Sequence, residues 1–287
     1  MRKIMMVVVL SVMAGGAYAA DFSELGVNAS DLKGRIVAEG VIMPPVSKGY
    51  VAGNDPSTGV PSKPVEWVSI PGGKFTMGTD DLGDLFTDAK PIHEVSIMTF
   101  KMSKTDVTVE QYAECVIKGK CEAPGIGGSC NWGVPGRQTH PVNCVSFAKA
   151  LQYAEFKHAR LPSESEWEYS ATSGGRNQMY PWGNAEPTRD LVVASANFTS
   201  PVCSKPAGNT AQGLCDMAGN VWQWVEDVYV GSYAHTPVDG SAYEGWGDAR
   251  VMRGGSIRDY TAEFLRADLR NLYRYGDRPD IGFRLAI

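Results

Sequence analysis

Six cysteines, all between residues 115 and 215, constrain the fold of this 287-residue chain more than any other feature. An even number of cysteines favours disulfide bonds when a chain reaches an oxidising compartment. Six cysteines can pair in many ways, and the sequence does not choose among them. We expect local pairing among the four cysteines of residues 115–144 and a bridge between Cys203 and Cys215. A zinc site is the competing interpretation, which is disfavoured because no C-x₂-C pair is present.

The first 19 residues have the features of a secretory signal peptide. Arg2 and Lys3 supply positive charge at the start, and residues 4–14 form an apolar run. Ala17 and Ala19 form a small-x-small cleavage site. The apolar run is shorter than the roughly 18–20 residues that span a membrane, and no later stretch is long and apolar enough. We therefore expect an exported protein, periplasmic, on the cell surface or secreted, without a membrane span.

The composition is that of a globular chain rich in loops. The sequence is 43% hydrophobic and 21% charged, with a formal net charge of −5, which excludes a wholly disordered chain. Its 32 glycines and 17 prolines accompany 7 tryptophans and 12 tyrosines, so large aromatic side chains rather than long helices are expected to hold the fold. A mildly acidic chain without a long basic run is untypical of nucleic-acid-binding proteins, and no nucleic-acid partner is expected.

Two regions follow the signal peptide. Residues 20–64 are rich in Gly, Pro, Ser and Asp with little periodicity, which is typical of a linker or N-terminal extension. The folded domain is expected to cover residues 65–287.

Short elements are expected within this domain. Strands are predicted at residues 65–70 and 74–78. Thr108, Ser146 and Ser163 are placed to cap three helices, the first ending near residue 117 and the second near residue 158. After residue 250 short strands alternate with turns, so the predicted fold class is α+β with many irregular loops.

Motifs spread over residues 65–287 resemble those of one known family. In chain order they are PGGKFTMG at 71–78, KTDVT at 104–108 with QY at 111–112, PVNCVS at 141–146, RLPSESEWEY at 160–169, YPWG at 180–183, GLCDMAGNVWQW at 213–224, RVMRGGS at 250–256 and GFRLA at 282–286. Together they resemble the formylglycine-generating enzyme, or sulfatase-modifying factor, domain. The resemblance implies a variant of the C-type lectin fold, α+β with little regular secondary structure.

The resemblance also implies a calcium site. Enzymes of the family hold calcium around an N-x-x-G-N-x-W-E stretch, whose matching positions here are Asp216, the carbonyls of Gly219 and Val221, and Gln223. Oxygen ligands of this kind suit calcium. Gln223 stands where glutamate is usual, which removes a negative charge and bidentate ligation, whereas Asp216 adds a charge where asparagine is common. Calcium is therefore the one cofactor that we expect from the resemblance.

The catalytic residues of the family are not present. Formylglycine-generating enzymes bind copper and activate oxygen with two cysteines just after the Gly-Gly-Ser turn, and those positions hold Asp259 and Phe264 here. Thiolates are the ligands that hold Cu(I), and no cysteine follows Cys215. We therefore expect no copper and no formylglycine generation by the cysteine and copper route, and the catalytic residues, if any, are unknown.

A pattern in the C-terminal segment, residues 257–280, suggests a ligand-binding surface. Irregular residues alternate there with fixed-looking ones, and the twelve irregular ones are Ile257, Arg258, Asp259, Tyr260, Phe264, Asp268, Leu269, Leu272, Tyr273, Tyr275, Asp277 and Pro279. Each can be encoded by an AAC codon altered at its adenines. This resembles the variable region of the target proteins of diversity-generating retroelements, several of which use the same lectin-like fold. Tyrosines suit such a surface because they give large, rigid contacts, and the ligand would be an unknown protein or small molecule.

Two alternatives stay open. Exported family members without the cysteine pair take part in periplasmic maturation of the siderophore pyoverdine, so an oxidoreductase-type maturation factor is one alternative. Its candidate polar groups are Arg258, Asp259, Tyr260, Arg266 and Arg270. A non-catalytic structural member is the other.

Burial separates these alternatives. A display surface requires exposed side chains, and the hypothesis fails if Ile257, Phe264, Leu269 and Leu272 all belong to the core. An enzyme should instead bury several of the twelve residues around a pocket with a perturbed titratable group.

Overall fold

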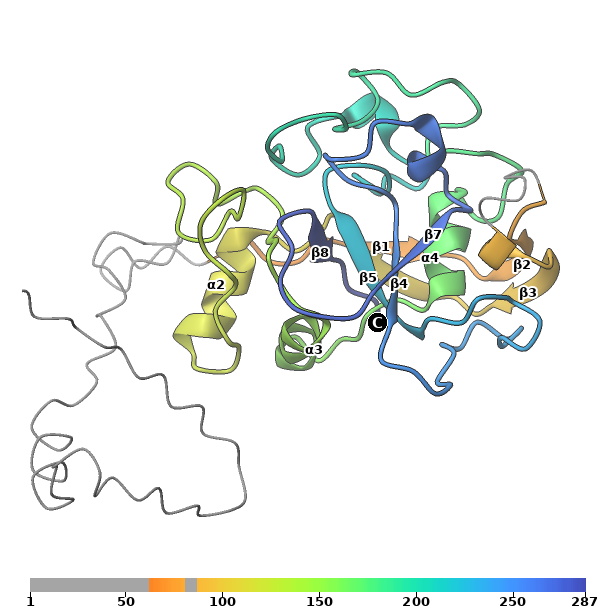
Figure 1. The fold of residues 1–287 in the computed structure, drawn as a ribbon, viewed down its shortest axis with the longest axis horizontal. Helices are drawn as coiled ribbons and strands as arrows, with labels where there is room; N and C mark the ends of the chain where they lie inside the picture. Colours follow the sequence, from red (N-terminus) through yellow and green to blue (C-terminus); the bar gives the residue numbers. More distant parts are fainter. Residues whose placement is uncertain (1–61, 81–86) are drawn as a thin grey trace, which may run out of the picture. The chain divides into compact units, whose positions relative to one another are not determined.

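The computed structural model describes residues 62–80 and 87–287, drawn as a coloured ribbon in Figure 1. The expected signal peptide, and all but residues 62–64 of the expected linker, lie outside the described residues. The described part contains three α-helices and eight short strands joined by long loops, which is the α+β architecture predicted. Within it, every helix is too short or too polar to cross a membrane.

Hydroxyl side chains set where the helices begin. Helix α2 (Val109–Ile117) follows Thr108, whose side chain accepts a hydrogen bond from the N–H of Gln111 while the Gln111 side chain accepts one from the N–H of Thr108. Helix α4 (Glu164–Ala171) has the same reciprocal arrangement at Ser163. Both helices therefore start where the capping signals predict.

Helix α3 (Phe147–Phe156) is capped by Ser146 and ends two residues before the predicted end at 158. His158 adopts φ +52°, which turns the chain out of the helix. Apolar periodicity cannot reveal such a turn, because the left-handed conformation leaves no mark in the pattern of buried residues.

The strands form three small sheets. They are β1 (Trp67–Ile70), β2 (Gly73–Met77), β3 (His93–Ile97), β4 (Phe100–Ser103), β5 (Trp222–Val228), β6 (Arg250–Arg253), β7 (Arg270–Tyr273) and β8 (Ile281–Phe283). Strand β1 pairs with β4, β2 pairs with β3, and the third sheet has the order β7-β6-β5-β8. In that sheet only the β5–β8 pair is parallel.

The C-terminal segment leaves and rejoins this four-stranded sheet. Figure 1 shows the chain, in blue, leaving β6 for the short 3₁₀ helix η4 (Ala262–Leu265) before it returns as β7. Two other 3₁₀ helices are η2 (Thr87–Ala89) and η3 (Pro206–Gly208).

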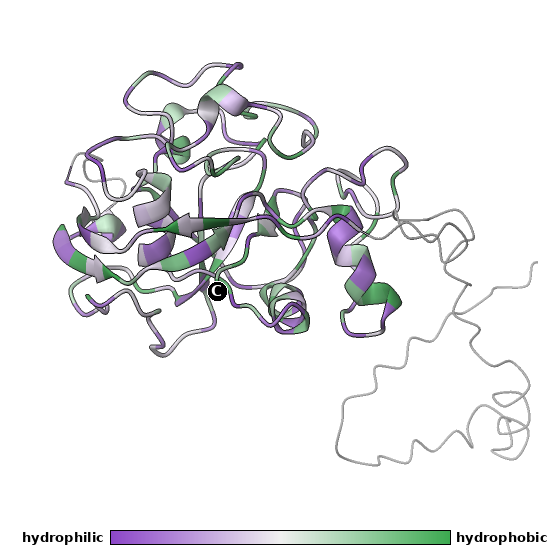
Figure 2. Ribbon diagram, turned by 180° about the vertical axis from the view of Figure 1, so that it is seen from behind, coloured by the Kyte–Doolittle hydropathy of each residue, from purple (hydrophilic) through white to green (hydrophobic). Residues whose placement is uncertain are grey.

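Large aromatic side chains fill the core, as the composition predicts. Trp167 belongs to one buried apolar cluster, and Trp222, Trp224 and Tyr153 belong to a second. Figure 2 shows hydrophobic and hydrophilic residues mixed along the helices and strands, as expected for short elements with one buried face. Aromatic side chains of this size bury more apolar area than any other residue type, which lets short elements form a stable domain.

All six cysteines form disulfide bonds. The pairs are Cys115–Cys121, Cys130–Cys144 and Cys203–Cys215. This confirms the expected local pairing, and the zinc alternative is wrong because every sulfur is used in a disulfide. Each bridge closes a short loop and so restricts the unfolded chain, an effect of about 2–4 kcal/mol in typical proteins.

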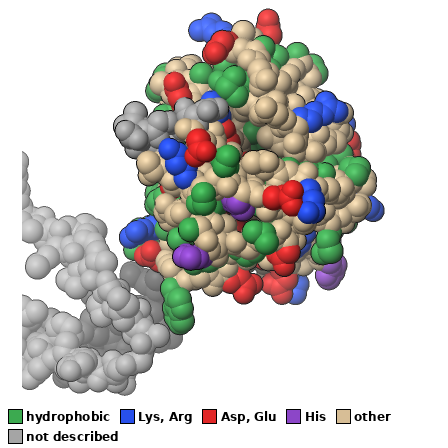
Figure 3. All heavy atoms as spheres, turned by 90° about the vertical axis from the view of Figure 1, so that its right-hand side faces the viewer, with side chains coloured by type: hydrophobic (Ala, Val, Ile, Leu, Met, Phe, Trp, Pro, Cys, Tyr) green, Lys and Arg blue, Asp and Glu red, His purple; other side chains and the backbone are tan. Residues whose placement is uncertain are grey.

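The face shown in Figure 3 carries both signs of charge. Lysine and arginine side chains are interspersed there with aspartate and glutamate, and apolar side chains lie between them. A face of this kind lacks the continuous basic surface of a nucleic-acid-binding protein.

Candidate functional site

A buried cluster of charges anchors the loop that carries the candidate site. The Glu164 carboxylate accepts hydrogen bonds from Arg253 Nη1 at 2.7 Å and from Arg270 Nη2 at 2.6 Å. Glu168, one turn along α4, accepts one from Arg253 Nη2 at 2.6 Å. Because the two arginines end β6 and begin β7, these ion pairs hold both ends of the loop at 254–269 against α4.

The loop begins with a turn that requires glycine. Gly254 and Gly255 have φ of +95° and +71°. A Cβ atom on Gly254 would lie 2.9 Å from the carbonyl oxygen of Met217, and one on Gly255 would lie 2.6 Å from that of Phe264. The Gly-Gly-Ser motif therefore brings the following residues close to η4.

Asp259 occupies the first of the two cysteine positions and closes a turn. Its Oδ2 accepts hydrogen bonds from the backbone N–H of Ser256 at 2.7 Å and from the Ser256 hydroxyl at 2.9 Å. Burial raises the pKa of the Asp259 carboxyl, and the two bonds from Ser256 oppose that rise. A carboxylate held in this way cannot replace a soft thiolate as a ligand for Cu(I).

Phe264 occupies the second cysteine position and packs against the core. It lies in η4, half-buried, with its ring edge-on to Trp222 at a centroid distance of 6.4 Å. Since all six cysteines are in disulfides, no thiol is available at either position. The family's copper and cysteine chemistry has no ligands in this chain.

The twelve expected ligand-binding residues differ in burial. The exposed ones are Arg258, Tyr260, Tyr275 and Asp277, and the half-buried ones are Asp259, Phe264, Asp268, Leu272, Tyr273 and Pro279. Ile257 and Leu269 are each only 1% exposed. The expectation of one surface made of all twelve side chains is therefore wrong for these two.

Backbone and core contacts explain this correction. The N–H of Ile257 donates to the carbonyl of Asn220, and the carbonyl of Ile257 accepts from the N–H of Ala196, so two other loops clamp this residue. Leu269 joins the apolar cluster around Trp222. Of the four residues that decide the display hypothesis, two are core and two, Phe264 and Leu272, are half-buried; the surface is therefore smaller than expected but not abolished.

Three hollows border the C-terminal segment, and irregular residues line each of them. The hollow beside Asp259 and Tyr260 has a volume of about 360 Å³, and the hollow beside Asp268 about 480 Å³. The hollow beside Phe264 and Leu272 has about 260 Å³. Volumes of this order suit a small ligand or a few side chains of a partner.

Paired charges line the hollow beside Asp268. Arg266 donates to Asp268 from Nε at 2.8 Å and from Nη2 at 2.5 Å. Glu168 also lines this hollow, and burial raises its pKa to about 7 against the opposing effect of Arg253. Each of these two acids therefore has an arginine partner.

An exposed tryptophan beside the end of the segment was not predicted. The Tyr275 hydroxyl donates to Asp248 Oδ2 at 2.8 Å, and Arg274 Nε lies 3.6 Å from Asp248 Oδ1. Trp246, two residues before Asp248, is fully exposed. Trp246 lies between Gly245 and Gly247, which have no side chains to cover it. This pattern is the sequence signal that could have predicted its exposure.

The expected calcium ligands have other partners. Gln223 Oε1 accepts hydrogen bonds from Trp167 Nε1 and from Arg284 Nε, both at 2.7 Å. Gln223 Nε2 donates to the carbonyl of Asp216 at 2.7 Å, and Asp216 Oδ2 accepts from the N–H of Cys203 at 2.7 Å. A calcium ion binds oxygen at about 2.3–2.6 Å, and on the Gln223 oxygen it would face a guanidinium group.

Too few oxygens of the expected ligand set remain free for calcium. The carbonyls of Gly219 and Val221 and one carboxylate oxygen of Asp216 are short of the roughly six to eight ligands that calcium takes. The described ranges also contain no group of three or more His, Cys, Asp or Glu side chains placed to hold a metal ion. The residues present do not fit the family's calcium site.

The fold and the site define the class of protein. It is a loop-rich α+β domain with the C-type lectin fold, whose C-terminal loop is anchored by a buried cluster of ion pairs. Residues 55–287 match the model of the Sulfatase-modifying factor enzyme 1-like domain, and the chain belongs to this family.

Individual relatives show the range of the family. Hercynine oxygenase of Mycolicibacterium smegmatis is 31% identical over 66% of this chain, which spans only 53% of that relative. The structure of PvdO from Pseudomonas aeruginosa is 30% identical with a TM-score of 0.67, covering 79% of this chain and 94% of its own. Treponema denticola variable protein 1, 20% identical with a TM-score of 0.63, covers 84% and 99% and has the same fold.

Proposed function

We propose that this chain is an exported ligand-binding protein, which recognises its ligand with side chains of residues 257–280 instead of using copper chemistry. The observation that carries the proposal is the use of the two cysteine positions. Asp259 closes a turn and Phe264 packs against Trp222, so both positions now serve the fold. The scaffold is kept while the reactive groups are not, and a fold can support many functions.

The exposed side chains of the segment suit recognition. Tyr260 and Tyr275 are 81% and 68% exposed, and exposed Arg258 accompanies them, whereas the Asp277 carboxylate is paired with Lys149 at 2.6 Å. Tyrosine, tryptophan and arginine contribute most to binding at protein interfaces, and exposed Trp246 adds to this set. The ion pairs at Glu164 hold the loop rigidly, which lowers the entropy lost on binding.

Export is part of the proposal. Three disulfides are typical of proteins that fold outside the reducing cytosol, and residues 1–19 have the signal-peptide pattern. Intact mass of the protein purified from its own cells tests this. We expect a chain that begins near residue 20 and contains no free thiol, whereas a full-length chain with six reduced cysteines would contradict export.

An alanine series tests whether the exposed side chains are free to serve a ligand. Replacing Arg258, Tyr260 and Tyr275 together by alanine should lower the free energy of unfolding by less than about 1 kcal/mol, since these side chains are exposed. Ile257→Ala or Leu269→Ala should each cost about 2–5 kcal/mol. Urea unfolding measures both, and equal losses would mean that the exposed set is needed for the fold.

An oxidoreductase-type maturation factor is the second candidate. The 30% identity to PvdO over nearly all of that protein favours it, as does the similarity to an oxygenase. Of its candidate polar groups, Asp259, Arg266 and Arg270 are hydrogen-bonded to other side chains. An oxygen electrode separates the two candidates: the binding proposal predicts no protein-dependent oxygen uptake with copper, iron or a thiol reductant. Uptake that Asp259→Asn abolishes would overturn it.

A further inference from the structure

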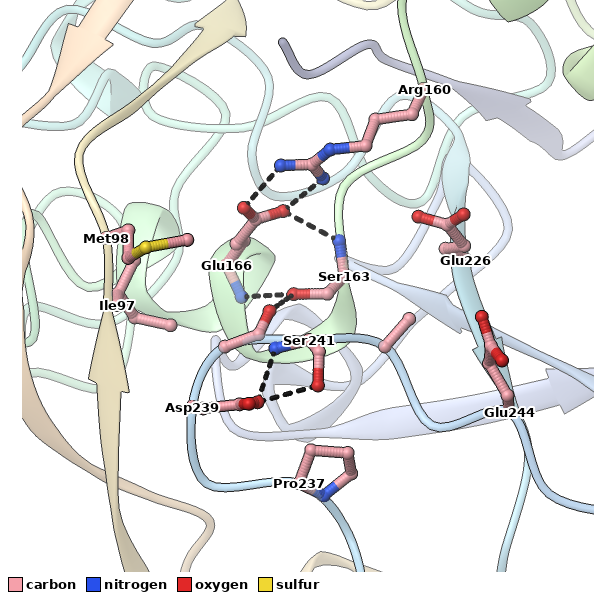
Figure 4. A pocket seen from close by; sticks show the side chains of 12 residues that line it. Ile97, Met98, Arg160, Ser163, Glu166, Glu226, Pro237, Asp239, Ser241 and Glu244 are labelled. Carbon is pink, nitrogen blue, oxygen red and sulfur yellow. Dashed lines mark hydrogen bonds and ion pairs between the residues drawn. The ribbon is translucent and has the colours of Figure 1, made fainter.

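A groove on another part of the surface has no role in the proposed function. It has a volume of about 690 Å³ and is lined by residues of β3, the start of α4, β5 and the loop at 237–244. No residue of the segment 257–280 lines it. Figure 4 shows the groove from close by.

The middle of the groove is rigid. Arg160 donates two hydrogen bonds of 2.6 Å to the carboxylate of Glu166, which also accepts from the N–H of Ser163. The Ser163 hydroxyl donates to the carbonyl of Gly240 at 2.8 Å and so ties the loop to α4. The shape of the groove is therefore set by the capping box of α4, and the charges of Arg160 and Glu166 cancel.

Three further carboxylates line the groove, so that with Glu166 its lining has four acids and one arginine. Figure 4 shows Glu226 and Glu244 on the same wall of the groove. Asp239 accepts hydrogen bonds from the hydroxyl and the N–H of Ser241, at 2.6 Å and 3.1 Å. Burial raises the pKa of the Glu226 carboxyl, the guanidinium groups of Arg160 and Arg250 oppose that rise, and the nearby charges of Glu166 and Glu244 add to it. The lining of the groove therefore has a net negative charge.

The opposite wall is apolar. Ile97 and Met98 lie there in Figure 4, facing Glu226 and Glu244 across the groove, and Pro237 lies at one end. Met98 is 81% exposed, which is unusual for a large apolar side chain. An occupant of the groove would thus meet an apolar wall on one side and carboxylates on the other.

We propose that this groove docks a segment of a partner protein that bears lysine or arginine beside apolar residues. Charge complementarity carries the choice of occupant: the excess of carboxylates over guanidinium groups in the lining attracts a cation, and the Met98 wall suits the aliphatic stem that lysine and arginine place behind their charge. A metal ion is a poorer occupant, since the described residues hold no cluster of three or more ligating side chains.

Peptide binding to the full mature protein tests this. The probes are a fluorescein-labelled peptide of alternating lysine and leucine, the same peptide with acetylated lysines, and free spermidine. We expect the first peptide to bind, with affinity that falls as salt is added, and the acetylated peptide not to bind. The double variant Glu226→Gln/Glu244→Gln should weaken binding about tenfold, as expected for the loss of two partly exposed ion pairs.

A matched control variant is available. Glu94→Gln/Glu155→Gln removes the same charge from exposed acids that do not line the groove, and it should bind the peptide as the wild type does. Equal weakening by both variants would mean that only net charge matters and would overturn the site. Binding of spermidine as tight as that of the peptide would overturn the choice of a protein partner. Met98→Ser, which keeps all the charges, should also weaken binding of the peptide. Unchanged affinity would show that the apolar wall does not contribute to binding.

Discussion

Gln223 and Arg284 meet in the middle of the domain, and their 2.7 Å hydrogen bond decides how this chain uses a family motif. In place of a glutamate that could bind calcium, the neutral amide of Gln223 accepts hydrogen bonds from the Arg284 guanidinium and the Trp167 indole. The motif thus holds the polypeptide together through its own side chains. A single change of residue type, from glutamate to glutamine, is visible in the sequence, but its partners are not.

The first prediction concerns this amide. Gln223→Glu replaces the donor Nε2 by an oxygen that faces the carbonyl of Asp216, so the free energy of unfolding should fall by about 1–3 kcal/mol. Urea unfolding with calcium and with a chelator measures it. Neither addition should move the wild-type midpoint, and a wild-type protein that a chelator destabilises would contradict the account.

The second prediction concerns pH. Asp227 is buried and accepts hydrogen bonds from the N–H groups of Glu164 and Tyr243, and burial raises its pKa to about 7. The unfolded value is about 3.9, so the folded state keeps a proton that the unfolded state releases. The resulting stability is complete below about pH 4 and is lost as the pH rises through about 7.

Asp227→Asn removes this titration. The variant loses one acceptor and should be less stable at low pH, but its free energy of unfolding should fall less steeply between about pH 4 and 7 than that of the wild type. Urea unfolding at several pH values gives the two slopes. Identical slopes would show that Asp227 keeps an ordinary pKa in the folded protein.

At the scale of elements, the helix caps are the most predictable features. Ser163 and Thr108 stand three residues before a glutamate or glutamine that completes a reciprocal cap, and both helices start there. The cap of α4 has a second role, since it ties the groove loop to the helix.

The third prediction compares two caps. Ser163→Ala should destabilise the protein by about 1–2 kcal/mol, because the hydroxyl accepts from the N–H of Glu166 at 3.1 Å and also holds Gly240. Ser146→Ala should cost less, since its bond to the N–H of Lys149 is 3.4 Å long and no reciprocal side chain supports it. Thermal unfolding ranks the two, and the reverse order would contradict this reasoning.

Loops were less predictable than helices, and the reason is physical. Ile257 and Leu269 are buried because distant loops and the Trp222 cluster cover them, and no local period records such contacts. The apolar wall at Met98 and the acids at Glu226 and Glu244 are likewise far apart in the sequence. The disulfide pairs could be predicted from the sequence only because a short spacing between cysteines favours local pairing.

At the scale of the whole molecule, one scaffold presents two separate surfaces. The family fold, its three disulfides and the buried ion cluster at Glu164 make the framework rigid. The C-terminal segment and the acidic groove share no lining residue, so each can be tested without disturbing the other. Both surfaces are proposed to bind, and neither depends on the copper chemistry for which the family is known.

The most direct test of ligand recognition by residues 257–280 is to sequence this gene, with its flanks, from many related isolates. If these residues form a diversified binding surface, substitutions should be concentrated in the codons of the exposed positions 258, 260, 275 and 277, at adenines of a nearby template repeat. Ile257 and Leu269 should stay apolar, because the core holds them. A uniform scatter of substitutions over the gene, with no template repeat or reverse transcriptase nearby, would contradict a diversified binding surface.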